Sequence, residues 1–132
     1  MSQAIKILFI DDQQDFLDTM EYWMKSKGYD VAVASDGEAG IAALKKSPAD
    51  IVFVDFKMAG MDGMEVVKKI REFNKQVPIV IVTAYAEDAL ITKTQEYNIS
   101  GFFSKVSSYE ELERVLDIVL RNLKRSKAEG KT

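Results

Sequence analysis

The stretch Ile51–Val54, with the sequence IVFV, is the part of the chain that decides the fold. It lacks the alternation of apolar and polar residues that a half-exposed strand shows. A continuous apolar run of this length indicates a strand covered on both faces, as in the parallel sheet of an α/β protein. The run stops at Asp55, so we expect a carboxylate at the carboxyl end of a buried strand.

Three more apolar runs stop at polar residues. They are Ile5–Ile10, followed by Asp11 and Asp12; Ile79–Val82, followed by Thr83; and Gly101–Phe103, followed by Ser104 and Lys105. Because the carboxyl ends of parallel strands meet at one edge of a sheet, we expect these side chains to share a pocket with Asp55. Three carboxylates, one hydroxyl and one ammonium could together hold a divalent cation and an incoming phosphoryl group.

Strand-like and helix-like segments alternate along the chain, which indicates an α/β fold. The expected strands are Lys6–Ile10, Asp30–Ala34, Asp50–Val54, Ile79–Val82 and Gly101–Ser104. The expected helices are about Gln14–Ser26, Glu38–Lys46, Gly63–Phe73 and Glu87–Tyr97, and a last helix that follows a capping-box pattern at Ser108 and Glu111 and has an apolar stripe to Leu123. Right-handed crossovers would place these five helices on both faces of a five-stranded parallel sheet. The helix at Glu87–Tyr97 has the weakest apolar stripe.

Composition narrows the chemistry that the chain can perform. Its 132 residues carry a formal charge of −3 and include no His and no Cys. The chain therefore has no Ser-His-Asp triad, no thiol nucleophile and no zinc site built from imidazole and thiolate. Oxygen ligands remain, and they suit Mg²⁺, Mn²⁺ or Ca²⁺.

Length and composition also indicate one domain, which we assign to residues 1–124, with a polar tail at 125–132 that is either disordered or a linker. No apolar run approaches the roughly 20 residues that cross a bilayer, and the N-terminus lacks a signal-peptide pattern. The absence of Cys fits a cytoplasmic protein. Basic residues crowd the tail, but the net charge gives no nucleic-acid footprint.

Each polar residue also has a simpler interpretation when it is taken alone. Asp11 or Asp12 could cap the helix that follows, and Asp55 could be an ordinary turn residue at a strand end. Thr83 could be a β-branched strand residue, and Lys105 a surface lysine. The occurrence of all of them at equivalent strand ends favours a joint site.

The order and spacing of the strand-end motifs resemble those of the receiver domain of response regulators in two-component systems, the CheY-like superfamily. The resemblance covers about Lys6–Leu123 and rests on Asp11-Asp12, Asp55–Gly63 (DFKMAGMDG), Thr83-Ala84 and Phe102–Lys105 (FFSK). It implies a flavodoxin-like doubly wound domain with strand order 2-1-3-4-5. It also implies a phosphoacceptor signalling domain that promotes only its own phosphorylation and dephosphorylation, rather than an enzyme.

The resemblance further implies a role for each site residue. Asp55 would accept a phosphoryl group from the phosphohistidine of a sensor histidine kinase or a histidine phosphotransfer domain. Asp12 and Asp55 would bind Mg²⁺, or Mn²⁺ in its place, with Asp11 acting through water and Lys57 through its backbone carbonyl.

Thr83 and Phe102 would form the switch, in which the hydroxyl moves toward the phosphoryl group and the ring turns inward behind it. The surface of the fourth helix, fifth strand and fifth helix would then change its preference for an unidentified downstream protein. A dimer that forms on phosphorylation is one alternative that the resemblance leaves open. Direct contact with nucleic acid or a membrane is not expected.

The chain departs from the family pattern in several places. Ala59 and Val106 stand where family members often have Pro, and Phe102 lacks the hydroxyl of a Tyr switch. Because a cis bond before a residue other than Pro costs roughly 3 kcal/mol, we predict a trans Lys105–Val106 bond.

Lys57 and Tyr85 occupy positions that flank the phosphoryl group in the family. We predict that these two long side chains slow hydrolysis of the phosphoryl group.

The sequence leaves other functions to be weighed. A Mg²⁺-dependent aspartyl-phosphate phosphatase would have a second acid at the position of Lys57. A flavin-binding electron carrier should have Ser, Thr and Gly in its first loop to bind phosphate, whereas the acidic loop Asp11–Asp15 would repel phosphate. A receiver that docks partners without being phosphorylated is a further alternative.

Overall fold

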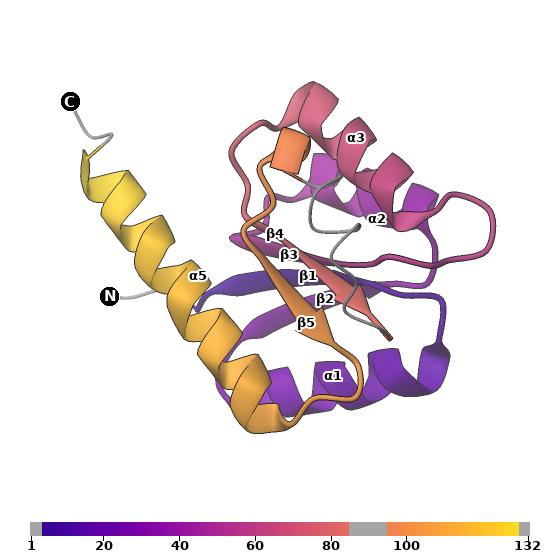
Figure 1. Ribbon diagram of the computed structural model, residues 1–132, viewed down its shortest axis with the longest axis horizontal. Helices are drawn as coiled ribbons and strands as arrows, with labels where there is room; N and C mark the ends of the chain where they lie inside the picture. The colour runs from indigo at the N-terminus through magenta and orange to yellow at the C-terminus, as the bar shows by residue number, and fades with distance from the viewer. Residues whose placement is uncertain (1–3, 85–94, 130–132) are drawn as a thin grey trace.

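The computed structural model describes residues 4–84 and 95–129. Figure 1 shows the alternation of strands and helices that the sequence predicts. The strands are β1 (Lys6–Ile10), β2 (Asp30–Ala34), β3 (Ile51–Asp55), β4 (Ile79–Thr83) and β5 (Gly101–Ser104). The helices are α1 (Gln14–Ser26), α2 (Gly37–Lys46), α3 (Gly63–Phe73) and α5 (Tyr109–Glu129), with a short 3-10 turn η1 (Gln95–Tyr97) before β5. Most of the helix predicted at Glu87–Tyr97 lies outside the described residues, and its described end is η1.

All five strands are parallel, in the order β2-β1-β3-β4-β5. Helices α1 and α5 cover one face of this sheet, and α2 and α3 cover the other (Figure 1). The predicted flavodoxin-like, doubly wound α/β fold is thereby confirmed. The strand order reverses at β1 and β3, and sheets of this kind bind their ligands beyond the carboxyl ends of the strands at such a point.

Alternate residues of the central strands face opposite layers. In β1, Ile7 and Phe9 pack with α1 and α5, whereas Leu8 and Ile10 pack with α2 and α3. Phe9 also stacks on Phe53 of β3, with 5.1 Å between the ring centroids. Full burial of one such side chain stabilises the fold by roughly 1.5–3 kcal/mol. The central strands therefore hold their carboxyl ends in a firmly packed frame.

The helix starts follow local capping. Helix α2 begins at Gly37 rather than at Glu38 because the Asp36 side chain accepts a hydrogen bond from the Ala39 amide at 2.8 Å. An acid at this position satisfies one of the free N–H groups of the first turn.

Helix α5 begins as its capping residue predicts and is longer than its apolar stripe. Ser108 Oγ accepts a hydrogen bond from the Glu111 amide at 3.2 Å. The helix then continues to Glu129, into the segment assigned to the polar tail. The sequence of that segment consists largely of good helix formers. The division of the chain at residue 124 stays a prediction.

Gly63 is the position where the chain most clearly requires a glycine. A Cβ built on it would lie 2.3 Å from the carbonyl oxygen of Asp55 and 2.8 Å from Cα of Phe56. These are backbone atoms at the end of β3, so they cannot swing aside. We expect Gly63→Ala to lower the free energy of unfolding by about 2–3 kcal/mol through overpacking.

Equilibrium urea denaturation of Gly63→Ala and Gly101→Ala measures this effect. A Cβ at Gly101 would lie 3.6 Å from its nearest neighbour, a Val115 side-chain atom, which is ordinary contact. The control should therefore change the free energy of unfolding by less than about 0.5 kcal/mol. Equal effects of the two substitutions would contradict the steric explanation.

Candidate functional site

The strand register brings the predicted site residues to one edge of the sheet. Ile10 of β1 pairs with Val54 of β3, so Asp11 and Asp55 follow at the same level of neighbouring strands. Thr83 ends β4, the strand next to Asp55, and is the register partner of Ser104 in β5. The arrangement follows directly from parallel pairing of strands whose apolar runs end together.

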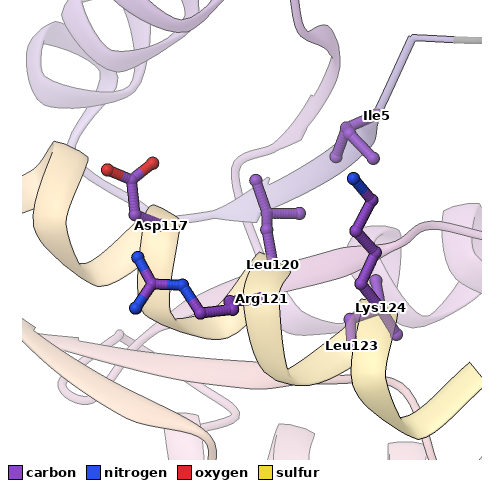
Figure 2. A pocket seen from close by; sticks show the side chains of 6 residues that line it. All are labelled: Ile5, Asp117, Leu120, Arg121, Leu123 and Lys124. Atoms are coloured by element: carbon purple, nitrogen blue, oxygen red, sulfur yellow. The ribbon is translucent and has the colours of Figure 1, made fainter.

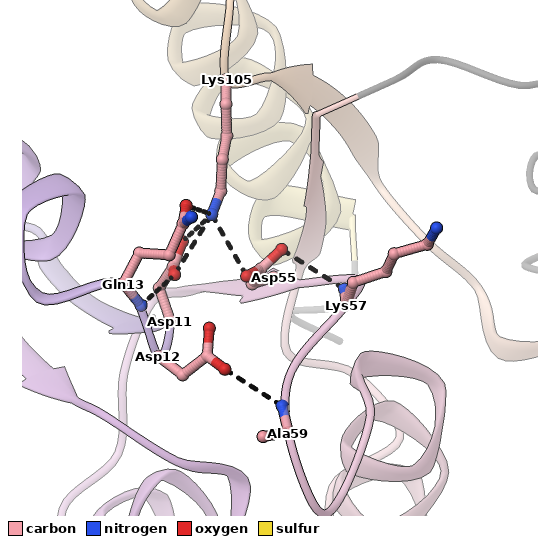
Figure 3. Close-up of polar contacts among 7 residues, drawn as sticks. All are labelled: Asp11, Asp12, Gln13, Asp55, Lys57, Ala59 and Lys105. Atoms are coloured by element: carbon pink, nitrogen blue, oxygen red, sulfur yellow. Dashed lines mark hydrogen bonds and ion pairs between the residues drawn. The ribbon is translucent and has the colours of Figure 1, made fainter.

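The three carboxylates form one cluster. Asp11, Asp12 and Asp55 each offer an oxygen, and these oxygens lie within 4.8 Å of one another. Asp11 is fully buried and Asp55 is only 3% exposed, whereas Asp12 is exposed. Asp12 accepts a hydrogen bond from the Ala59 amide at 3.0 Å, which ties the acid pair to the loop after β3 (Figure 3).

Neither acid caps α1. The residue before the helix is Gln13, which is extended and makes no side-chain capping bond. Asp11 Oδ1 instead accepts a hydrogen bond from the Gln13 amide at 2.9 Å, which shapes the loop between β1 and α1. The simpler interpretation of the acid pair as a helix cap is therefore wrong.

Lys105 places its ammonium between the two buried carboxylates (Figure 3). Its Nζ lies 2.9 Å from Asp11 Oδ2 and 3.2 Å from Asp55 Oδ2. The same Nζ donates to Gln13 Oε1 at 2.6 Å, and it lies 4.8 Å from the ring centroid of Phe16. The interpretation of Lys105 as a surface lysine is wrong, because its side chain is only 12% exposed.

The backbone around Lys105 agrees with the predicted peptide geometry. No described peptide bond is cis, so the Lys105–Val106 bond is trans as predicted. The Lys105 amide donates to the Thr83 carbonyl at 2.8 Å, which continues the β4–β5 pairing one step beyond the strand ends.

Two buried acids close together make the site electrostatically unbalanced. Burial raises the pKa of Asp55 from 3.8 to about 6, the charge of Asp11 adds to the rise, and Lys105 opposes it. Three carboxylates face one ammonium, so the cluster has an excess of negative charge at neutral pH.

This donor set fits a hard divalent cation. Its ligand atoms are carboxylate oxygens, the type that Mg²⁺ prefers. Asp11 Oδ2 is buried and pairs with Lys105 Nζ, yet no described donor gives it a well-directed hydrogen bond. The Lys57 amide lies 3.4 Å from Asp55 Oδ1, and the Lys57 side chain points away from the carboxylates (Figure 3). The role predicted for the Lys57 carbonyl stays a prediction.

The two residues predicted to form a switch lie on one face of neighbouring strands. Phe102 is the register partner of Ile81, and both pack in the α2–α3 layer. Thr83 is two residues beyond Ile81 and therefore on the same face. Phe102 is half-buried. Their roles in switching remain predictions, as does that of Tyr85, which lies outside the described residues.

Gln13 and Phe16 belong to the site although the sequence did not single them out as site residues. Both contact Lys105, and both come from the loop and first turn that follow the acid pair. The position of Gln13 directly after Asp11-Asp12 is the only signal in the sequence that could have identified it.

A hollow lies at the amino end of β1, at the opposite end of the strand from the acidic cluster. It encloses about 420 Å³ between α5 and the start of β1, with Ile5, Leu120 and Leu123 as its apolar part (Figure 2). Ile5 precedes β1 whereas Asp11 follows it, so this hollow is separate from the acidic site. None of the described helices is both long and apolar enough to cross a membrane.

Comparisons with known proteins agree with this geometry. The family model "Response regulator receiver domain" matches residues 7–117. Sporulation initiation phosphotransferase F from Bacillus subtilis is 29% identical over 107 residues, which are 81% of this chain and 86% of that protein.

The similarity extends to a solved structure and to a longer protein. The structure of chemotaxis protein CheY4 from Vibrio cholerae has a TM-score of 0.85 at 26% identity, over 89% of this chain and 99% of that one. Transcriptional regulatory protein ZraR from Klebsiella oxytoca is 26% identical over 126 residues, which are 96% of this chain. The present chain spans only 28% of that regulator's length.

Proposed function

This chain belongs to the response regulator receiver domain family of two-component systems, and from this we propose that it accepts a phosphoryl group on Asp55 in a phosphorelay. The position of Asp55 is the observation that supports the proposal most strongly. It is a nearly buried carboxylate with an ammonium 3.2 Å from one oxygen and two further carboxylates within 4.8 Å. A carboxylate suited to act as a nucleophile, acids suited to bind a cation and a counter-charge thus adjoin one another.

In the proposed transfer, an Asp55 oxygen attacks the phosphorus of a phosphohistidine on a sensor histidine kinase or histidine phosphotransfer domain. The P–O bond forms while the P–N bond breaks, and the imidazole nitrogen leaves with the electron pair. The acyl phosphate carries about two negative charges where the carboxylate carried one. Lys105 and the Thr83 hydroxyl are suited to bind phosphoryl oxygens as they arrive.

We propose Mg²⁺ as the cofactor, with Mn²⁺ as a substitute. Asp12 and Asp55 would bind it directly, Asp11 through water, and Lys57 through its carbonyl oxygen. When bound, the ion would neutralise charge on the transferring phosphoryl group. The excess of negative charge in the cluster supports a cation at this place.

The output is proposed to run through Thr83 and Phe102. A phosphoryl group that binds the Thr83 hydroxyl better in one conformer than in another would shift the population between them. The surface of β5, α5 and the segment expected to form the fourth helix would then select a downstream protein or a second copy of the chain. In this role the chain is a phosphoacceptor signalling domain and acts on no other substrate.

Incubation with acetyl phosphate and Mg²⁺, followed by intact-mass measurement, tests the proposal. We expect one added phosphoryl group on the wild-type protein, and none on Asp55→Asn or in the presence of EDTA. The control Asp30→Asn changes an exposed acid in β2 and should be phosphorylated like the wild type. A wild-type protein that gains no mass would instead favour a receiver that docks partners without phosphorylation.

We predict that Lys57 and Tyr85 prolong the life of the acyl phosphate. Both lie two residues beyond a site residue, at positions that flank the phosphoryl group in the receiver family. A long side chain that turns toward the phosphoryl group from there would hinder the attacking water. The variant Lys57→Ala/Tyr85→Ala should lose its phosphoryl group roughly three to ten times faster, which corresponds to about 1 kcal/mol in the barrier. The decay of the phosphorylated mass after removal of acetyl phosphate measures this, and an unchanged half-life would refute the prediction.

A further inference from the structure

The ammonium of Lys105 is held from the side of α1 as well as by the carboxylates. Gln13 Oε1 accepts from Nζ at 2.6 Å, the shortest of the contacts that this nitrogen makes in the described site. The ring of Phe16 lies on another side, with its centroid 4.8 Å from Nζ. An aromatic face at this distance attracts a cation.

These contacts matter because, apart from the ion pairs with Asp11 and Asp55, little else directs this side chain. The Lys105 amide donates to the Thr83 carbonyl, but the lysine side chain has four further rotatable bonds, and ordering them costs conformational entropy. The next residue, Val106, is 85% exposed and gives no packed support. Phe16 and Lys105 also border a hollow of about 660 Å³ between α1 and the start of α5, so the side chain has room to turn away from Asp55.

We propose that Gln13 and Phe16 are positioning residues that hold the Lys105 ammonium against Asp55. The Gln13 side chain does not cap α1, so it is available for this contact. Its amide is neutral and therefore fixes the ammonium without repelling an anionic phosphoryl group. During phosphoryl transfer, the Nζ–H group of Lys105 that faces Asp55 would donate its hydrogen bond to a phosphoryl oxygen instead. Asp11, Gln13 and Phe16 would keep Nζ in place. This second part rests on the proposed function.

Acylation of the protein by an amine-reactive ester, with no phosphoryl donor present, tests the positioning directly. Peptide mass spectrometry then gives the labelling rate of each lysine. We expect Lys105 to react about five times faster in Gln13→Ala, which is the effect of losing one hydrogen bond worth about 1 kcal/mol. Phe16→Leu, which keeps an apolar side chain but removes the ring face, should also speed its labelling.

Internal controls separate positioning from a general loosening of the fold. The exposed Lys57 should react at the same rate in all variants. Gln14→Ala is the matched control, because the Gln14 side chain donates its hydrogen bond to Asp18 on the exposed side of α1 rather than to the Lys105 site. Gln13→Glu keeps an acceptor oxygen and should keep Lys105 protected. An unchanged labelling rate of Lys105 in both Gln13→Ala and Phe16→Leu would overturn the proposal.

The rate of phosphorylation by acetyl phosphate tests whether positioning serves the reaction. Gln13→Ala should slow it roughly three- to ten-fold in the wild-type background and have no further effect in a Lys105→Met background. Equal slowing in both backgrounds would show that Gln13 does not act through Lys105 and would overturn this part. A wild-type protein that is not phosphorylated would refute the proposed function, while the labelling experiment would still decide whether Lys105 is held.

Discussion

Replacement of Lys105 by Met is expected to lower the free energy of unfolding by about 3 kcal/mol at neutral pH in metal-free buffer. The ammonium lies 2.9 Å from Asp11 and 3.2 Å from Asp55, and both acids are nearly or fully buried. Without it, two carboxylates remain in a poorly solvated place with no counter-charge between them. Removal of one partner from a buried ion pair is costly for this reason, whereas an exposed pair contributes little.

Urea denaturation followed by the fluorescence of Trp23, the only tryptophan, measures this loss. Lys25→Met is the matched control, since Lys25 pairs with Glu21 at 3.0 Å on the exposed side of α1. Its effect should stay below about 0.5 kcal/mol. The double variant Lys105→Met/Asp55→Asn should be more stable than Lys105→Met alone, because it buries one charge fewer. If Lys105→Met lowers the free energy of unfolding as little as Lys25→Met does, Lys105 does not balance the charge of the two buried acids.

Asp55→Asn is expected to have the opposite effect and to stabilise the metal-free protein. Burial, reinforced by the charge of Asp11, raises the pKa of Asp55 from 3.8 to about 6. The folded protein therefore binds this proton more tightly than the unfolded chain does. The resulting stabilisation is complete below about pH 4, declines between about pH 4 and pH 6, and is absent above that range. At neutral pH the buried charge costs the wild type roughly 1–2 kcal/mol after allowance for the lost contact with Lys105, and Asn removes that cost.

The pH dependence of unfolding identifies the cause of this gain. The difference between Asp55→Asn and the wild type should be largest near pH 7 and shrink toward about pH 4, where the carboxyl is protonated in both states. Mg²⁺ should also reduce the difference, because a cation that binds the folded wild type stabilises it by mass action. A gain that is the same at every pH would mean that the substitution acts through packing rather than through charge.

The sequence was sufficient to predict the sheet and the residues at its edge. Continuous apolar runs such as Ile51–Val54 mark strands buried on both faces, and parallel strands align the residues that follow them. The alignment of these strand ends is the reason that the sequence alone predicts one site for Asp11, Asp55, Thr83 and Lys105. Helix α2 starts one residue earlier than predicted because Asp36 caps it. Strand β3 is Ile51–Asp55 rather than 50–54, and β4 extends to Thr83, because parallel pairing continues through the polar residues that end the apolar runs.

The contacts that depend on loop paths could not be predicted. Gln13 is a polar residue in a loop, and no periodic pattern tells which group its amide reaches. Arg71 is another case, because a charged residue near the end of an amphipathic helix resembles a surface residue. It is nevertheless buried and donates to the carbonyl oxygens of Tyr97, Asn98 and Asn74 at 2.8, 3.0 and 3.1 Å. Burial lowers its pKa, and the three carbonyl partners satisfy its donors.

The identity of the phosphorylated residue tests most directly the claim that Asp55 is the phosphoacceptor. Borohydride reduces an aspartyl phosphate to homoserine with release of phosphate, so the modified position can be sequenced by tandem mass spectrometry after phosphorylation by acetyl phosphate with Mg²⁺. We predict homoserine at position 55 in the wild type, and none there when the donor is omitted or when Asp55 is replaced by Asn. Homoserine at another aspartate, with Asp55 unmodified, would contradict the assignment of Asp55 as the phosphoacceptor.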